Sequence, residues 1–157
     1  KYQFKCFQEK WLKRFGWFLF KPLSEKDEHN FKVLRVPISD DQFEFDQQSL
    51  ALTKVLVDSL NEKEIKKQIK RTIPREAKSI SKLSQWLQEQ GFTDYEPHIK
   101  FLRSLQDLRT GAAHRKGETY QRGVEYFKLD RKPLANVFED ILIQAADFLN
   151  YLDKRLL

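Results

Sequence analysis

Apolar side chains recur every three or four residues along most of the chain, which is the spacing of one face of an α-helix. This spacing first appears near the start of the chain, where the recurring residues are aromatic and basic residues lie between them. It predicts a helix whose aromatic face lies in a core or an interface, with a helix lying on a membrane surface as the alternative. The aromatic residues are Phe4, Phe7, Trp11, Phe15 and Phe18.

The next segment changes both pattern and charge. Residues 31–37 alternate apolar and basic side chains and end at Pro37, which predicts a short strand or an extended connector. Residues 39–46 are acidic, and acidic residues are typical of a first helical turn because they face the positive end of the helix dipole. The helix that follows is predicted to turn four apolar residues inward: Leu50, Val55, Leu56 and Leu60.

The second half of the chain contains four further helical patterns. Ile65, Ile69 and Ile73 lie four apart, which predicts a helix that stops before Pro74. A helix over about residues 79–90 is expected to end at Gly91. Thr93 or Asp94 is expected to cap the next helix, which has Pro97 in its first turn. Its apolar stripe is Ile99, Leu102, Leu105 and Leu108. The last helix is expected to begin near Pro133 and to be a long amphipathic element that runs through Val137, Ile141, Leu142, Ala145, Phe148, Leu149 and Leu152.

Together these elements predict an all-α fold, a bundle of five or six helices in a single domain over residues 1–157. We expect residues 1–38 to form an N-terminal extension and residues 39–157 to form the bundle. Five Gly and five Pro are too few for the turns of an all-β sandwich. The chain begins at Lys1 and contains no Met, so we expect it to be a piece of a longer polypeptide.

The residues that bind metals and form disulfides are sparse. Cys6 is the single cysteine, which favours a reducing, cytoplasmic location. The three histidines (His29, His98 and His114) lie far apart and lack the spacing of a metal site, so no metal and no other cofactor is expected. The longest apolar run, residues 16–20, is far shorter than the roughly 20 residues that span a bilayer, so no membrane partner is expected.

The charge is unevenly distributed. The chain has 29 Lys and Arg against 23 Asp and Glu, a net charge of +6, which favours an anionic partner. Residues 63–82 hold eight cations and two anions, and therefore the whole excess. This stretch is either a solvated helix face or a surface that follows the phosphates of RNA. The residues we expect to contact RNA here are Lys63, Lys66, Lys67, Lys70 and Arg71.

A second basic segment lies between the last two predicted helices, where Arg109 and His114 are separated by four residues. An arginine and a histidine at this spacing, at the end of a bundle helix, resemble the R-x(4–6)-H motif of the HEPN superfamily of all-α nucleases. The resemblance covers roughly residues 48–155. The sequence departs from the family pattern at Thr110, where a larger polar residue such as Asn, Asp or His is common.

The resemblance implies a metal-independent endoribonuclease in a toxin–antitoxin or antiviral system. It implies Arg109 and His114 as the catalytic pair, a homodimer that shares the site, and products with 2′,3′-cyclic phosphate and 5′-hydroxyl ends. An antitoxin or another regulatory protein would be a further partner. Four residues after the motif would contact the RNA: Arg115, Lys116, Tyr120 and Arg122.

Helix geometry constrains this hypothesis, because five residues at about 100° each would place Arg109 and His114 roughly 140° apart on an unbroken helix. Either Gly111 interrupts the helix or two subunits share the site. Alternatively, His114 caps a helix C-terminus ahead of Gly117. The alternative function is a catalytically inactive helical module that binds a protein or nucleic acid through the aromatic face of residues 4–18 and the acidic residues Asp40, Asp41, Glu44 and Asp46.

Overall fold

The computed structural model describes residues 1–109 and 117–157. Over these ranges the chain is all-helical, with eight α-helices, one π-helical turn and no strand beyond an isolated bridge between Phe20 and Leu60. The all-α prediction is confirmed, whereas the expected five or six helices are too few. The elements are α1 (Tyr2–Phe15), α2 (Glu25–Lys32), α3 (Gln42–Thr53), η1 (Lys54–Asp58), α4 (Glu62–Gln68), α5 (Ser79–Glu89), α6 (Glu96–Asp107), α7 (Glu118–Phe127) and α8 (Leu134–Leu156).

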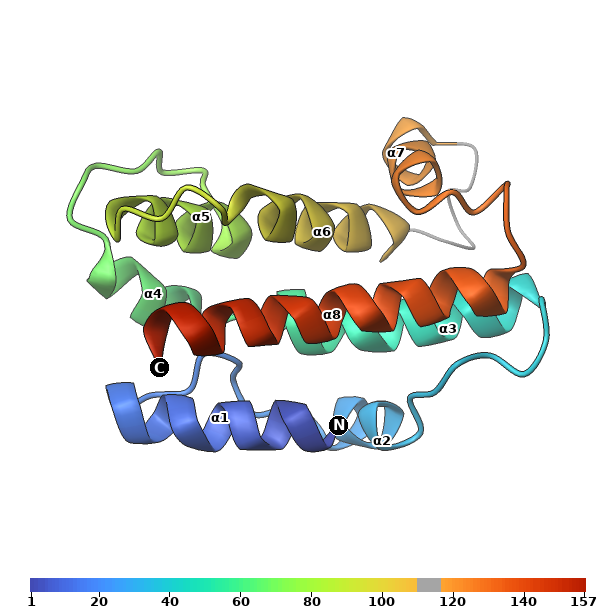
Figure 1. Ribbon diagram of the computed structural model, residues 1–157, viewed down its shortest axis with the longest axis horizontal. Coiled ribbons are helices and arrows are strands. Elements are labelled where there is room, and N and C mark those ends of the chain that lie inside the picture. Colours follow the sequence, from blue (N-terminus) through green and yellow to red (C-terminus); the bar gives the residue numbers. More distant parts are fainter. Residues whose placement is uncertain (110–116) are drawn as a thin grey trace.

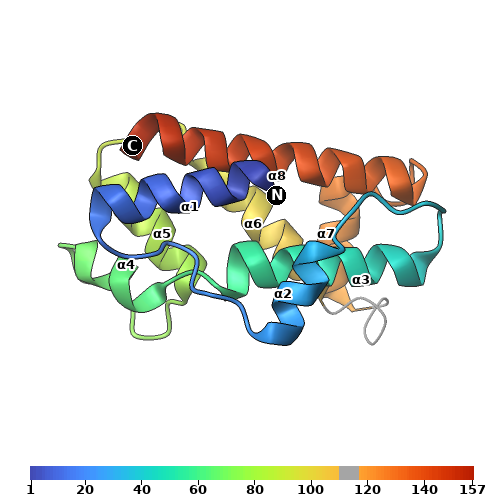
Figure 2. The same cartoon turned by 90° about the horizontal axis from the view of Figure 1, so that it is seen from below.

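The long helix α8 runs across the middle of the view in Figure 1 and along one edge of the molecule in Figure 2. It lies beside α3, with α1 and α2 on one side and α5 and α6, arranged end to end, on the other. α4 and α7 lie toward opposite ends of the long axis in both views (Figures 1 and 2). Among the described helices, none is long and apolar enough to cross a bilayer. The largest fully buried side chains of the core are Trp11, Phe20, Phe45, Phe101, Phe138 and Phe148.

The predicted aromatic helix is α1, and its aromatic face belongs to the core. Phe7 and Trp11 are buried, and the Trp11 ring meets the Trp86 ring of α5 edge to face at 5.8 Å. α1 ends at Gly16, whose φ of 77° lies in the left-handed region that glycine adopts without a Cβ penalty. Phe18 therefore lies beyond the helix rather than on its face, which corrects the predicted range.

The segment predicted as a short strand or connector contains the end of a helix. The Ser24 hydroxyl accepts a hydrogen bond from the Asp27 N–H at 3.2 Å and caps α2. α2 includes Phe31 and Lys32, and residues 34–37 form an irregular connection. The strand alternative is therefore wrong, because the capped, acidic first turn of α2 carries the helix into the region that alternates in sequence.

The acidic stretch does begin a helix, since the Asp41 carboxylate accepts a hydrogen bond from the Glu44 N–H at 3.1 Å and caps α3. Val55, Leu56 and Leu60 are buried as predicted. Leu50 is 36% exposed, so its predicted inward position is wrong. Phe45 and Leu52 direct one face of α3 into the core, and at 100° per residue Leu50 lies about 140° from Phe45.

The basic stretch is less regular than its isoleucine spacing predicts. α4 ends at Gln68, and Ile69 is already extended, with ψ at 127°. The Glu89 carboxylate accepts hydrogen bonds from the backbone N–H groups of Lys70 at 2.9 Å and Arg71 at 2.7 Å. These bonds hold the chain outside the helical path, and the predicted continuation of the helix to Pro74 is wrong.

Lys82 is a further exception to the predicted solvated basic face. Lys82 as a whole is 8% exposed, and its ammonium group forms an ion pair with Glu62 at the start of α4. A buried lysine needs such a partner because an unpaired charge away from water is strongly unfavourable. Lys82 therefore holds α5 against α4, and only part of the charge excess faces an external partner.

The last three predicted helices correspond to α5, α6 and α8, and only the N-cap of α6 differs from the prediction. α5 and the left-handed Gly91 occupy the predicted positions, and Pro133 caps α8. The N-cap of α6 is Tyr95 instead of Thr93 or Asp94. The Asp94 carboxylate is already used elsewhere, because it accepts hydrogen bonds from Tyr151 and Arg155 of α8.

Candidate functional site

Arg109 lies two residues beyond the end of α6 and is anchored by the buried Leu105 and Leu108 before it. Its guanidinium Nη1 donates a hydrogen bond to Oδ1 of Asp58 at 2.7 Å. The Arg109 side chain is 45% exposed and that of Asp58 is 28% exposed. The pair therefore leaves part of a permanent cation open to an anionic ligand while one side of the guanidinium is fixed.

Asp58 is placed by the π-helical turn η1, which continues α3. In this turn the N–H of Ser59 donates to the carbonyl oxygen of Lys54, five residues earlier, at 3.0 Å. Val55 and Val57 are buried within the turn and hold it against the core. π-turns within helices are rare and occur often at functional sites. The position of η1 therefore supports this region as a candidate functional site.

Asp58 belongs to a chain of alternating charges. Lys54 forms an ion pair with Asp27 of α2 at 2.7 Å, and the hydrogen bond from Lys54 lowers the pKa of Asp27. Burial raises the pKa of Asp58, although the positive charges of Arg109 and Lys54 oppose that shift. A carboxyl group with a raised pKa beside an arginine is a candidate site group, because both properties are common at reaction centres.

The rest of the predicted motif lies outside the described residues. These are His114, Arg115 and Lys116, together with Thr110 and Gly111. The predicted catalytic pair and the alternative role of His114 as a helix cap therefore stay predictions from the sequence.

The two candidate RNA contacts on α7 are placed differently. Arg122 is exposed, and its Nε lies 3.7 Å from Oδ2 of Asp107 on α6. Burial raises the pKa of Asp107, with Arg122 opposing the shift. The ring of Tyr120 is buried, and its hydroxyl accepts a hydrogen bond from Gln42 of α3 at 3.3 Å. We therefore place Tyr120 with the core rather than with an RNA surface.

Close packing of α6 against α7 fixes the position of the Arg109 backbone. A Cβ on Gly123 of α7 would lie 2.7 Å from Cδ2 of Leu108 and 3.2 Å from the carbonyl oxygen of Ser104. Leu108 immediately precedes Arg109. Gly123 thus permits the approach of α7 to the end of α6 that carries the candidate arginine.

The basic stretch on and after α4 lies far from α7 along the long axis of the molecule (Figures 1 and 2). Its five candidate cations are exposed, and Lys67 pairs with Glu64 at 2.7 Å. The structure therefore does not bring this stretch and Arg122 into one compact site. The five are Lys63, Lys66, Lys67, Lys70 and Arg71.

Within residues 1–109 and 117–157, no group of three or more His, Cys, Asp or Glu side chains is arranged to hold a metal ion. No protein-family model, curated protein or solved structure matches the chain. Asp58 is the site residue that sequence reasoning missed. Its only signal is a carboxylate directly after the apolar run Val55–Val57, and its partner lies 51 positions away.

Proposed function

We propose that the chain is a metal-independent endoribonuclease of the HEPN type. The observation that carries the proposal is the partly exposed guanidinium of Arg109, fixed by Asp58 at the end of α6. In the sequence, Arg109 is also the arginine of the R-x(4–6)-H motif.

The chemistry needs few groups, because RNA carries its own nucleophile. The 2′-oxygen attacks the adjacent phosphorus, the bond to the 5′-oxygen breaks, and a 2′,3′-cyclic phosphate and a 5′-hydroxyl remain. His114 would move the proton, since the ordinary pKa of histidine, about 6.5, suits that role near neutral pH. Arg109 would stabilise the negative charge that builds on the phosphoryl oxygens, and Asp58 would orient its guanidinium.

RNA would then be held by Arg122 and by Arg115 and Lys116, which directly follow His114. The cations on and after α4 would contact only an RNA long enough to reach the other end of the molecule (Figure 1). Each lysine or arginine that neutralises a phosphate makes the affinity more dependent on salt. A longer RNA should therefore bind with a steeper salt dependence than a short one.

An exposed apolar stripe on α3 supports the proposed homodimer. Phe43 and Leu50 are 61% and 36% exposed and lie seven residues apart, on the same face of α3. Lys54 continues this face into η1, which carries Asp58. A second copy that covers Phe43 and Leu50 would lie close to the Asp58–Arg109 pair, so that two sites could face one RNA.

The test is cleavage of end-labelled RNA in the presence of EDTA. Arg109→Ala and His114→Ala should each lose about a hundredfold or more in rate. Arg103→Ala is the matched control. Arg103 is an exposed arginine on α6, the helix that ends two residues before Arg109, and its Nη2 donates a hydrogen bond to Ser81. Unchanged cleavage by His114→Ala, or loss of all cleavage in EDTA, would contradict the proposal.

A second candidate function is a catalytically inactive module that binds a protein partner. The exposed apolar residues Val33, Ile38 and Phe43 favour it, because together they offer a contact surface on α2, α3 and their connection. The aromatic face of α1 does not contribute, since Phe7 and Trp11 are buried. Stable binding of a partner or RNA with no cleavage of any RNA tested would favour this function.

A further inference from the structure

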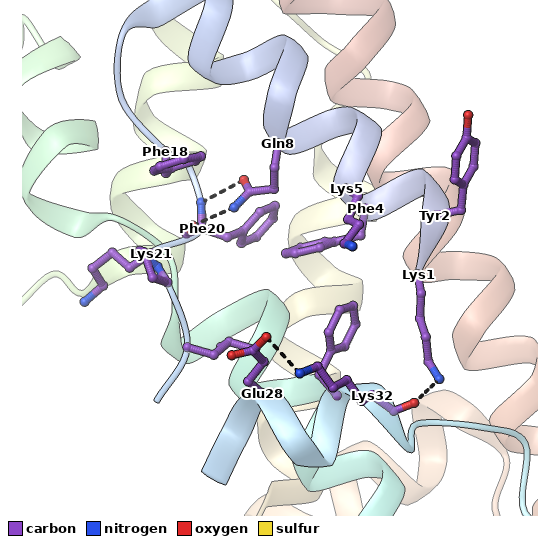
Figure 3. A pocket seen from close by; sticks show the side chains of 13 residues that line it. Lys1, Tyr2, Phe4, Lys5, Gln8, Phe18, Phe20, Lys21, Glu28 and Lys32 are labelled. Atoms are coloured by element: carbon purple, nitrogen blue, oxygen red, sulfur yellow. Dashed lines mark hydrogen bonds and ion pairs between the residues drawn. The ribbon is translucent and has the colours of Figure 1, made fainter. Parts of the chain in front are cut away.

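A pocket of about 820 Å³ opens between α1, the segment that follows it, and α2 (Figure 3). Its volume lies in the range of small-molecule sites, roughly 300–1,000 Å³. Most of its wall is aromatic or aliphatic. The apolar residues of the wall are Phe4, Phe18, Phe20, Pro22, Leu23 and Phe31.

The one amide side chain in the wall has its polar atoms occupied. Nε2 of Gln8 donates to the carbonyl oxygen of Phe20 at 2.7 Å, and its Oε1 accepts from the N–H of Phe20 at 3.4 Å. Both bonds are drawn in Figure 3. Gln8 thereby fixes the chain that forms the far wall and offers little to a polar ligand, so the interior favours an apolar group.

The rim is cationic. Lys5 of α1, Lys21 after α1 and Lys32 of α2 lie on three different sides of the pocket (Figure 3). Glu28, the single carboxylate of the wall, pairs with Lys32 at 3.2 Å. Within the described residues, Lys5 and Lys21 form no ion pair. The rim therefore has a charge that an anion on the ligand would complement.

A smaller cavity of about 200 Å³ adjoins the pocket. Phe4 and Phe31 line both spaces, and their rings meet edge to face at 5.3 Å. Behind them the wall is mostly aliphatic, with Leu52, Val55 and Leu149 among its residues. A thin apolar chain can lie along Phe4 and Phe31, which both spaces share, and it fits this wall better than a compact ring system.

We propose that this pocket binds a single-chain acyl amphiphile with an anionic head, a carboxylate or a phosphate monoester. The head lies at Lys5 and Lys21, and the chain lies along Phe4 and Phe20 toward the smaller cavity. This site uses none of the residues proposed to cleave RNA, so the two proposals are tested independently of each other.

Isothermal titration with octanoate, decanoate and dodecanoate tests the apolar part. Burying each added methylene contributes about 0.8 kcal/mol to the binding free energy, which corresponds to an affinity gain of about fourfold. We expect this gain to continue until the chain fills both cavities. An affinity that does not change with chain length, or the absence of binding below about 1 mM for all three, would overturn the proposal.

The charge is tested with decyltrimethylammonium and with charge reversal. The cation should bind at least tenfold more weakly than decanoate, and Lys5→Glu/Lys21→Glu should lose at least tenfold in decanoate affinity. Lys13→Glu/Lys66→Glu is the matched control, because both lysines are exposed and lie outside the pocket. Equal binding of cation and anion, or equal losses in both double variants, would refute an anion-selective rim.

Vesicles of phosphatidylglycerol distinguish a free amphiphile from a membrane lipid with the same chemistry. Binding of dodecanoate in solution supports the proposal whether or not the protein also sediments with vesicles. If dodecanoate competes with the vesicles, both ligands bind in this pocket. Sedimentation with vesicles and no affinity for free dodecanoate would contradict it.

Discussion

Asp58 and Arg109 are 51 positions apart in sequence, yet the carboxylate accepts a 2.7 Å hydrogen bond from the guanidinium. The bond joins the last residue of η1 to a residue two positions beyond the end of α6. Both side chains come from ends of helical elements, where the backbone leaves the core and a charged group reaches water. The contact therefore fixes a cation at the surface of a well-packed core.

Asp58→Asn should lower RNA cleavage by roughly ten- to a hundredfold, because a hydrogen bond between charged groups contributes about 1.5–3 kcal/mol. We expect the loss mainly in kcat, since Asp58 orients Arg109 and does not touch RNA. Asp58→Glu should restore part of the rate. An unchanged kcat in Asp58→Asn, measured with single-turnover kinetics, would show that Arg109 needs no such partner.

The stability of Asp58→Asn should depend on pH differently from that of the wild-type chain. The pKa of Asp58 is raised by burial, so ionising it costs folding free energy as the pH rises through the interval above its ordinary value of 3.8. The variant avoids this loss, and its free energy of unfolding relative to wild type should increase from about pH 4 to pH 6. Urea unfolding at both pH values measures the difference, and a decrease would reverse the inferred direction of the pKa.

Gly123→Ala should destabilise the fold by about 1–3 kcal/mol through overpacking against Leu108. Without that contact the same change would stabilise a helix by up to about 1 kcal/mol. Adding Leu108→Ala should make the two effects non-additive, because the second change removes the atom that the new Cβ meets. Thermal unfolding of the two single variants and the double variant checks this, and a stabilised Gly123→Ala would contradict it.

Phe43→Glu/Leu50→Glu should give a monomer and abolish cleavage if a second copy covers the apolar stripe of α3. Each charge would have to be buried in the interface without a partner, which is strongly unfavourable. Ile143→Glu is the control, because Ile143 is an exposed apolar residue on α8. Sedimentation equilibrium measures the outcome, and the same mass for wild type and the double variant would count against this interface.

Asp94 should contribute to stability at neutral pH and lose that contribution in acid. Hydrogen bonds from Tyr151 and Arg155 hold its pKa below the ordinary 3.8. The contribution is therefore complete above the unfolded-state pKa and disappears as the pH falls through the folded-state pKa. Asp94→Asn should lower Tm near neutral pH and lose less Tm than wild type on acidification to about pH 2. Asp130→Asn, at an exposed carboxylate after α7, should follow the wild type.

The sequence predicted the helices with long apolar stripes and missed two shorter ones, α2 and α7. The missed helix α7 does have an inner face, formed by Tyr120, Gly123 and Phe127. α5, α6 and α8 carry buried residues at regular spacing. α2 is eight residues long and buries none of its residues, so its cap at Ser24 was its main sequence signal. The isoleucines after Lys63 show the opposite error, because Glu89 binds the chain at Lys70 and Arg71 where the periodicity continues.

Of the two residues of the Asp58–Arg109 pair, only Arg109 was predictable from the sequence. Arg109 follows from a local motif, whereas Asp58 is brought to it by tertiary packing and by a π-turn that no local pattern announced. Tyr120 shows why residue type alone is a weak guide to RNA contacts. A tyrosine in a polar stretch that follows a basic segment was predicted to contact RNA, but its place on the inner face of α7 buries the ring.

The π-turn also changes the phase of the helix that contains it. Because one additional residue enters the turn between Lys54 and Ser59, the faces before and after it are offset from one continuous stripe. α3 contacts α2 and α8, while η1 also contacts α5. Deleting a single residue from this turn would restore an uninterrupted helix and rotate the side chains at its end, Asp58 among them, by about 100°. A one-residue difference in length would thus suffice to remove the carboxylate from Arg109 without altering any residue of the motif.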